Sequence, residues 1–379
     1  MNTRQICTKC VMDKSDPAIT FDHEGVCHYC RDYETSILPF HEDVEGRRRA
    51  LNEKIAQIKS SSPKSDYNCI IGLSGGVDSS YLALKVHEWG LRPLVVHVDA
   101  GWNSAEAVQN IGAIIDHCGF ELHTHVVDWE EIKELQKAYL RSGVPHQDVP
   151  QDHIFASVLY NFAINNGIKY VLSGGNTATE FVLPSSWQWS AMDAINLHAI
   201  NRRFGGKKLR RYRTTSYFQY YFTFPFIHRL ETFRPLNYID YNKGEAEQQL
   251  VRQVGYRKYK RKHGESVFTK FFQNHYLPER YGYDKRIAHL SSMILSGQIT
   301  REEALTSLAE PLYEGSDLRK DMRFIADKLD ISVDELEAMF ALPKRNHDEF
   351  PNWKNYHRRI KAIQRRVERL LGRKIRVYS

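Results

Sequence analysis

The segment Ser74-Gly75-Gly76-Val77-Asp78-Ser79-Ser80 constrains the fold of this chain more than any other. It follows an apolar run at residues 69–73 and precedes an amphipathic run at 79–89, so it joins a predicted strand to a predicted helix. Gly75 and Gly76 allow a tight turn and let the backbone approach an anion without a Cβ in the way. Loop amides and the start of the helix would then face phosphate oxygens. The segment therefore predicts a phosphate-binding loop.

The side chains of this loop suit a nucleotide phosphate. Ser74, Ser79 and Ser80 supply hydroxyl donors, while Gly75, Gly76 and Val77 supply backbone groups. Asp78 repels phosphate, so we expect it to bind Mg²⁺ or to fix the loop. The Walker pattern is absent because no lysine stands at the start of the helix. An ordinary glycine-rich turn is the structural alternative.

The surrounding pattern predicts an α/β fold with a parallel sheet flanked by helices. Further strands are expected at residues 93–99, 122–128 and 169–173, and helices at 104–118, 130–141 and 154–165. After Pro235 helical signals dominate, with capping-box patterns at 300–303 and 332–335. We predict four regions: a cysteine-rich module at 1–40, a helical linker at 41–64, the phosphate-loop domain at 65–239 and a mainly helical region at 240–379.

Four cysteines near the N-terminus form two CxxC pairs separated by sixteen residues: Cys7, Cys10, Cys27 and Cys30. This spacing is typical of a zinc ribbon in which four thiolates leave no open coordination position, so the Zn²⁺ would be structural. An iron–sulfur cluster is the alternative. Cys69 and Cys118 lie in a predicted strand and helix, and we expect both to be core residues.

The net charge of +7 is unevenly distributed. Residues 354–376 contain ten Lys or Arg and one acidic residue, and subtracting this excess of nine from +7 leaves −2 for the remainder. This balance argues against nucleic-acid binding by the main body. No apolar run is long enough to span a bilayer and no secretory signal is evident, so we expect a cytoplasmic protein without membrane insertion.

The string SGGVDS resembles the signature of the PP-loop ATP pyrophosphatases, which cleave ATP to AMP and pyrophosphate. The resemblance implies that Val98 and Asp99, at the end of a predicted strand, lie near adenine. It also implies that SGGNTATE at 173–180 forms a second nucleotide loop, with Gly174 and Asn176 binding nucleotide and Glu180 binding a second Mg²⁺. A surface salt bridge is the alternative role of Glu180.

Six motifs occur in one order along the chain: the cysteine module, SGGVDSS, PQDH at 150–153, SGGNTATE, KHGES at 262–266 and LP…YDKR at 277–286. Together they resemble the N-acetyl sugar amidotransferase family of bacterial surface-polysaccharide and nonulosonate biosynthesis. Lys260-Arg261 departs from the glycine pair expected there. The resemblance implies conversion of an acetamido group to an acetamidino group, with ATP adenylating the amide oxygen and ammonia displacing AMP.

The same resemblance implies the remaining site residues and partners. Lys262 and His263 are catalytic candidates together with Asp78 and Glu180. Lys262, His263 and Arg286 have the charge to bind a sugar carboxylate or a nucleotide diphosphate, with solvated surface as the alternative. Asp152 and His153 are candidates for contact with the sugar, with helix capping as the alternative. No glutaminase motif is present, so ammonia would come from a separate glutaminase subunit and an ammonia-channelling subunit resembling the histidine-biosynthesis synthase.

Two other functions fit parts of the sequence. Thiolation of tRNA by a PP-loop enzyme is the main rival, but it typically needs cysteines near the nucleotide, and neither Cys69 nor Cys118 is predicted there. A non-catalytic ATP-binding partner of the same pathway is the second alternative.

Two aromatic or basic segments remain open. Seven aromatic residues at 217–226 are expected to pack in the core, with stacking on a sugar or base as the alternative. The apolar face of the basic C-terminal helix is expected to dock on this chain or on a partner subunit.

Overall fold

The computed structural model describes residues 5–61, 66–259 and 264–371. At its centre lies a five-stranded sheet in the order β3-β2-β1-β4-β5, and every neighbouring pair is parallel. The strands are β1 (Cys69–Gly72), β2 (Pro93–Asp99), β3 (Leu122–Val126), β4 (Tyr170–Leu172) and β5 (Glu231–Phe233). This confirms the predicted fold class. Strand β5 has no counterpart among the predicted strands, because only Phe233 of its three residues is apolar, whereas the equally short β4 reads Tyr-Val-Leu.

Alternating side chains of the strands divide the interior into two cores. Ile70 of β1 packs in the first core, whereas Cys69 and Ile71 pack in the second. Val171 and Leu172 of β4 separate in the same way. Such strands, buried on both faces, need helices on both sides.

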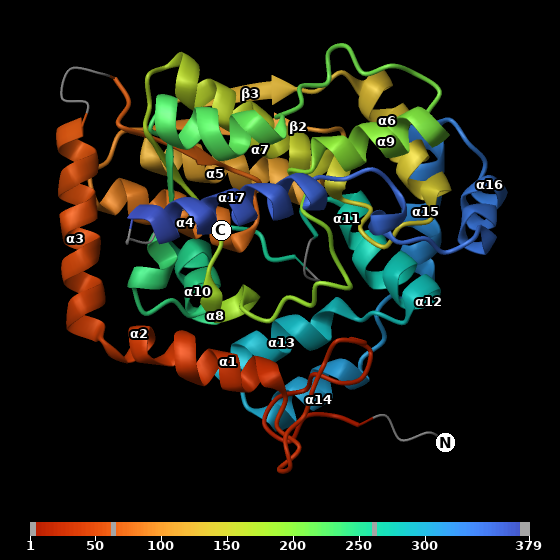
Figure 1. The fold of residues 1–379 in the computed structure, drawn as a ribbon, viewed down its shortest axis with the longest axis horizontal. Coiled ribbons are helices and arrows are strands. Elements are labelled where there is room, and N and C mark those ends of the chain that lie inside the picture. The colour runs from red at the N-terminus through yellow and green to blue at the C-terminus, as the bar shows by residue number, and fades with distance from the viewer. Residues whose placement is uncertain (1–4, 62–65, 260–263, 372–379) are drawn as a thin grey trace.

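Helices cover both faces of the sheet (Figure 1). The first core contains residues of α6 (Trp129–Ser142), α7 (Val149–Asn165) and α9 (Ala194–Phe204). The second contains residues of α3 (Val44–Ser61), α4 (Val77–Glu88), α5 (Ala105–Cys118) and α10 (Lys243–Val254). Ser104 caps α5 by accepting a hydrogen bond from the Ala107 amide, and Gly119 ends the helix at φ +63°.

The N-terminal module packs on the C-terminal helices rather than standing apart (Figure 1). Its cysteines share a third hydrophobic cluster with Trp187 and Ile287. Helices α1 (His28–Ser36) and α2 (Leu38–Glu42) then lead to α3.

The region after β5 is helical, as predicted. Besides α10, it contains α11 (Val267–Phe271), η3 (Phe272–Tyr276), α12 (Leu277–Tyr281), α13 (Lys285–Leu295), α14 (Arg301–Ala309), α15 (Gly315–Leu329), α16 (Val333–Ala338) and α17 (Lys354–Leu371), together with the short helices η2 (Pro235–Tyr238), η4 (Met339–Ala341) and η5 (His347–Glu349). Capping boxes begin α14 at Thr300 and α16 at Ser332. Phe268 and Ile325 belong to the first core and Leu250 to the second. The helical region after residue 239 therefore packs into the same two cores as the sheet and its helices. Within the described ranges, no helix has both the length and the apolar character to cross a membrane.

Candidate functional site

The predicted phosphate loop joins β1 to α4. Gly76 precedes the helix in an extended conformation, and Gly75 has φ +81°. A Cβ on Gly75 would lie 2.7 Å from the Ala107 carbonyl oxygen, so only glycine fits there. The Ser74 and Ser79 hydroxyls lie 3.0 Å apart, and the Gly76 amide donates to Ser74 Oγ at 3.3 Å. These hydroxyls and amides form a polar turn at the carboxyl end of β1, where α/β folds bind ligands.

A second glycine turn touches this loop through its backbone. Gly174 follows β4, and a Cβ built on it would lie 2.9 Å from the Asp78 carbonyl oxygen and 3.2 Å from the Ser79 amide nitrogen. Real Cβ atoms do not approach backbone that closely. The two predicted nucleotide loops are therefore adjacent, and their contact requires glycine at position 174.

Asp78 lies in a hydrogen-bond network that joins three parts of the chain. The Tyr241 hydroxyl donates to Asp78 Oδ1, and Asn176 Nδ2 donates to the same oxygen at 3.4 Å. Asn176 also caps the short helix α8 (Thr177–Glu180) by accepting from the Thr179 amide at 3.0 Å. Burial, followed by the Asp78 charge, raises the pKa of Tyr241 well above its usual range, so this hydroxyl stays a donor.

A cavity of 430 Å³ opens beside the two loops. It is lined by Ser74, Gly76, Val77, Asp78, Ser79, Gly174, Gly175, Glu180, Lys243, Glu247, Tyr259, Glu265 and His289. Among the described residues of this lining, four carboxylates accompany one lysine, and divalent cations would offset their repulsion of an ATP polyphosphate. Asp78 and Glu180, which follow β1 and β4, are hard oxygen ligands suited to Mg²⁺. The donor set therefore fits the predicted metal.

Charged side chains continue from this cavity to the start of α7. Asp148 is 4% exposed and accepts from Gln151 Nε2 at 3.1 Å and Thr269 Oγ1 at 3.2 Å. Burial and the charge of Asp152 raise the pKa of Asp148. Burial lowers the pKa of Lys285, opposed by the charges of Asp148, Asp152 and Glu180. This cluster thus couples electrostatically to a residue of the phosphate cavity.

Asp152 is not the N-cap of its helix, because α7 begins at Val149 and Asp152 lies in the first turn. Its carboxylate lies 3.7 Å from His146 Nε2. Although 47% of the side chain is accessible, displacement of water by surrounding protein raises its pKa to about 6. The structure therefore places a carboxylate that accepts protons near neutral pH at the start of α7, outside the described lining of the cavity.

The structure does not bring His153 and Arg286 to the cavity. His153 is fully buried and both ring nitrogens are engaged: Nδ1 donates to the Ala191 carbonyl at 2.7 Å, and Nε2 accepts from the Thr215 amide at 3.0 Å. Burial lowers its pKa to about 4, in keeping with a neutral ring. Arg286 pairs with Asp284 at 2.8 Å and donates to carbonyls at the end of α14, as at Glu310. Both residues are structural.

The described lining of the phosphate cavity also lacks six other predicted ligands: Gly75, Ser80, Val98, Asp99, Asp152 and Asn176. Ser80 is fully buried, because it faces inward from α4. Asp99 accepts from the Gly101 amide and from Asn103, closing the turn after β2. Val98 packs against the first core. Lys262 and His263 lie outside the described residues.

Several residues of the site were not singled out from the sequence. Lys243 and Glu247 of α10 and His289 of α13 line the cavity, and Tyr241 just before α10 donates to Asp78. Lys285 of α13 is outside the described lining and interacts electrostatically with Glu180. No local motif marks Tyr241, which is 163 residues from its partner Asp78. Only the fold brings these positions together.

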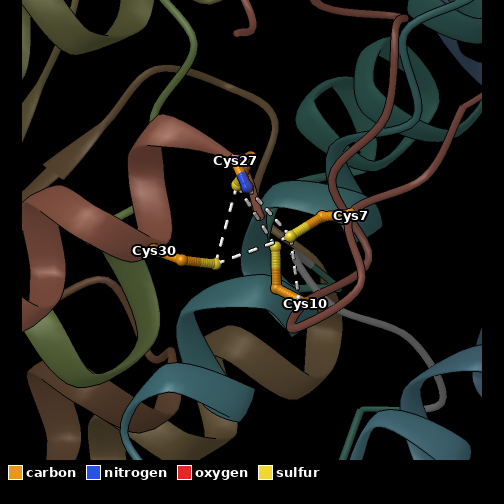
Figure 2. A group of neighbouring side chains, drawn as sticks. All are labelled: Cys7, Cys10, Cys27 and Cys30. Carbon is orange, nitrogen blue, oxygen red and sulfur yellow. Dashed lines mark hydrogen bonds between the residues drawn. The ribbon is translucent and has the colours of Figure 1, made fainter. Parts of the chain in front are cut away.

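The four N-terminal cysteines converge on one point (Figure 2). All are fully buried, and all four sulfurs lie within 4.8 Å of one another. The closest pairs, Cys7–Cys30, Cys10–Cys27 and Cys27–Cys30, are 3.7, 3.6 and 3.6 Å apart. Tetrahedral Zn–S bonds of about 2.3 Å place sulfurs about 3.8 Å apart. The geometry therefore fits the predicted zinc.

The cysteine module is hydrogen-bonded to helices α13 and α14. Arg301 donates to the carbonyls of Cys10 and Cys7, both at 3.1 Å, and the Val11 amide donates to Ser291 of α13 at 3.3 Å. The neighbouring Ser292 accepts from the Val182 amide at 2.9 Å, two residues after Glu180. The metal module thus supports the helix and loop that border the phosphate cavity.

Comparisons with known proteins agree with part of this assignment. The family model described as "LPS biosynthesis protein WbpG-like, C-terminal domain" matches residues 265–364. This part of the chain is similar to that domain. The match confirms the predicted resemblance to surface-polysaccharide biosynthesis proteins over the region that carries Lys285 and His289.

Two solved structures are weakly similar to this chain. An NH3-dependent NAD synthetase from Campylobacter jejuni is 14% identical, with 42% of this chain and 73% of that chain covered and a TM-score of 0.30. An NMN synthetase from Francisella tularensis is 14% identical, with 76% and 94% covered and a TM-score of 0.34. Values this low assign no activity. No curated protein sequence matches the chain.

We expect Gly174→Ala to weaken ATP binding about 10- to 100-fold, because the added methyl group pushes the Asp78 backbone and misplaces the phosphate loop. Calorimetric titration with ATP and Mg²⁺ would measure this loss. The matched control is Gly112→Ala in α5, where a Cβ meets nothing within 4 Å. Equal ATP affinity in both variants would contradict the loop contact.

We expect Asp152→Asn to raise the melting temperature near neutral pH. The folded pKa of about 6 exceeds the ordinary 3.8, so the folded state holds this proton more tightly and wild-type stability falls as pH rises between these values. The neutral amide of the Asp152→Asn variant has no proton to lose in this range, so the variant keeps its stability as pH rises. Melting curves from pH 4 to pH 8 should show the difference between variant and wild type growing up to about pH 7. A variant less stable than wild type near neutral pH would contradict the assignment.

We expect about one zinc per chain, and none in Cys10→Ser, because three thiolates do not complete the site. Elemental analysis together with melting curves would measure both metal and stability. Cys118→Ser is the matched control, since Cys118 is buried in the second core away from the cluster. Iron with visible absorption would establish the alternative cluster instead.

Proposed function

We propose that this protein is an ATP-dependent amidotransferase that converts an acetamido group of an N-acetylated sugar or sugar acid to an acetamidino group, for lipopolysaccharide or related surface polysaccharides. The observation that supports this best is the cavity at the SGGVDSS loop with Asp78 and Glu180 on its wall, in a chain whose residues 265–364 match a WbpG-like domain.

The proposed reaction has two steps. The acetamido oxygen attacks the α-phosphorus of ATP, and the bond to pyrophosphate breaks, giving an O-adenylyl imidate. Ammonia then adds to the imidate carbon and AMP leaves with the former amide oxygen. Ammonia loses a proton in this step, and an amidine replaces the amide.

The residues of the cavity divide these tasks. Amides and hydroxyls of the Ser74–Ser79 turn would hold the departing pyrophosphate. When bound, Mg²⁺ on Asp78 and Glu180 would offset the phosphate charge. Asp152 lies at the start of α7, outside the described lining of this cavity, and its pKa of about 6 suits it to accept a proton from the attacking nitrogen near neutral pH.

The positions of the remaining cysteines argue against sulfur transfer. Cys69 begins β1, at the end of the strand opposite the phosphate loop, and is fully buried. Cys118 ends α5 and is 7% exposed. Burial raises the pKa of the Cys118 thiol to about 11, which suppresses the reactive thiolate. Neither sulfur lines the phosphate cavity, so thiolation of tRNA finds no carrier there.

Ammonia is proposed to come from a separate glutaminase, delivered through an ammonia-channelling synthase subunit. Free ammonium salts would replace both partners in an assay with the isolated chain. The reaction can therefore be tested without them.

We expect incubation with ATP, Mg²⁺, ammonium and a diacetamido sugar acid to release AMP and a product about one mass unit lighter, because NH replaces O. Asp78→Asn should lower kcat/KM about 100-fold or more through loss of a metal ligand. Asp116→Asn, an exposed residue near the end of α5, is the control. Nucleotide binding without AMP release, for every acetamido sugar tried, would favour a non-catalytic ATP-binding partner.

A further inference from the structure

A second cavity, of 510 Å³, lies along the outer strand of the sheet. It lies beside β5, the π-helix η1 (Gln219–Ile227) and the short helix η2 (Pro235–Tyr238). Its walls carry seven aromatic side chains: Tyr160, Tyr220, Tyr221, Phe224, Phe226, Phe233 and Tyr238. Its volume falls in the range of small-molecule sites, about 300–1,000 Å³. The aromatic stretch expected to fill the core thus also forms a cavity wall.

Aromatic contacts hold the rings on two sides of this cavity in place. Tyr220 and Tyr221 lie 6.2 and 5.4 Å from the ring of Trp353, which is itself buried. On the other side, Tyr238 lies 5.0 Å from Phe233. Rings held in this way offer flat apolar faces without a large loss of side-chain entropy on binding.

Strand β5 offers backbone polar groups to the same space. The Glu231 amide donates to the Lys169 carbonyl and the Phe233 carbonyl accepts from the Ser173 amide, so these residues bond toward β4. Because strand residues alternate, the Thr232 amide and carbonyl face the open edge of the sheet. Thr232 lines the cavity. The edge therefore supplies a hydrogen-bond donor and an acceptor for a ligand.

Arg234 connects this cavity to the phosphate site. Its Nε lies 3.7 Å from the Cβ position of Gly175, and Glu180 Oε2 lies at the same distance from that position. Gly175 and Glu180 line the phosphate cavity, whereas Arg234 lines the aromatic one. Across the described part of the chain, no carboxylate forms an ion pair with the Arg234 guanidinium. This arginine is free to bind an anion between the two sites.

We propose that the aromatic cavity binds the sugar substrate, with the pyranose ring against the tyrosines and its anionic group, a carboxylate or a phosphate, on Arg234. A guanidinium forks onto either anion, and the apolar face of a sugar ring packs on aromatic rings. This assignment rests on the proposed function, because it names the site for that substrate. The sugar would then enter from the β5 edge while ATP occupies the neighbouring cavity.

The test is binding of acetamido sugars to the full chain, followed by saturation-transfer NMR and calorimetry with a non-hydrolysable ATP analogue present. We expect Arg234→Gln to weaken sugar binding about tenfold or more by loss of the bidentate pair, with ATP-analogue affinity unchanged. Phe226→Ala should weaken it to a smaller degree and preserve the fold, since Phe226 is 56% exposed. The matched control is Arg252→Gln, an exposed arginine of α10 outside both cavities.

Comparison of two sugar ligands identifies which anionic group binds Arg234. One arm uses a diacetamido sugar acid, and the other uses a nucleoside-diphosphate acetamido sugar. Binding of either one that falls in Arg234→Gln supports the site and identifies the group on the guanidinium. If the variant binds both sugars as wild type does, or loses the ATP analogue instead, the site is refuted.

The test of the sugar site and the test of the proposed reaction can fail independently. Sugar binding that depends on Arg234 without any amidine product would retain the site and overturn the reaction. Amidine formation with the same KM for sugar in wild type and Arg234→Gln would retain the reaction and overturn the site.

Discussion

The contact between the backbones at Gly174 and Asp78 determines the geometry of the site. It joins the loops after β1 and β4, two neighbouring parallel strands, with no side chain between them. Through this contact the helix start at Gly76 and the cap of α8 at Asn176 become parts of one wall. Asp78 and Glu180 then face the same cavity, which is the arrangement required of two metal ligands on a shared polyphosphate.

The helical C-terminal region completes this wall and is not an appendage. Tyr241 donates to Asp78, and His289 and Lys285 approach from α13. The cysteine module contacts α13 through Ser291 and α14 through Arg301, far from the phosphate loop in sequence. Stability supplied by a metal there would reach the site by holding a helix in place. A small module without a core of its own suits that role.

Much of the fold was predictable because short-range sequence patterns determine many of its helices and strands. Buried strands, the Ser104 cap, both capping boxes and the CxxC spacing leave short-range signals that the structure confirms. The phosphate loop was equally visible, since glycine and hydroxyl spacing determine its geometry. The predicted helix began at Ile154, five residues after α7 begins at Val149, although Pro150 in the first turn is itself a helix-start signal. Asp152 therefore lies within the first turn and not at the N-cap, which was one of its two alternatives.

Residues whose roles depend on tertiary contacts escaped prediction. His153 and Arg286 have the chemistry of ligands, but their donors and acceptors are used by neighbouring backbone. Conversely, Tyr241 and Arg234 belong to no motif, and their positions follow from how the chain crosses the sheet edge. A sequence shows which groups are available, whereas burial and partners decide which of them remain free to act.

The most direct measurement of the proposed chemistry follows the acetamido oxygen. A substrate labelled with ¹⁸O at that oxygen would be incubated with ATP, Mg²⁺ and ammonium, and the AMP analysed by mass spectrometry. If the amide oxygen attacks the α-phosphorus, the label appears in the phosphate of AMP, in proportion to amidine formed. Unlabelled AMP, with ¹⁸O retained in the sugar or found in pyrophosphate, would contradict adenylation of the amide.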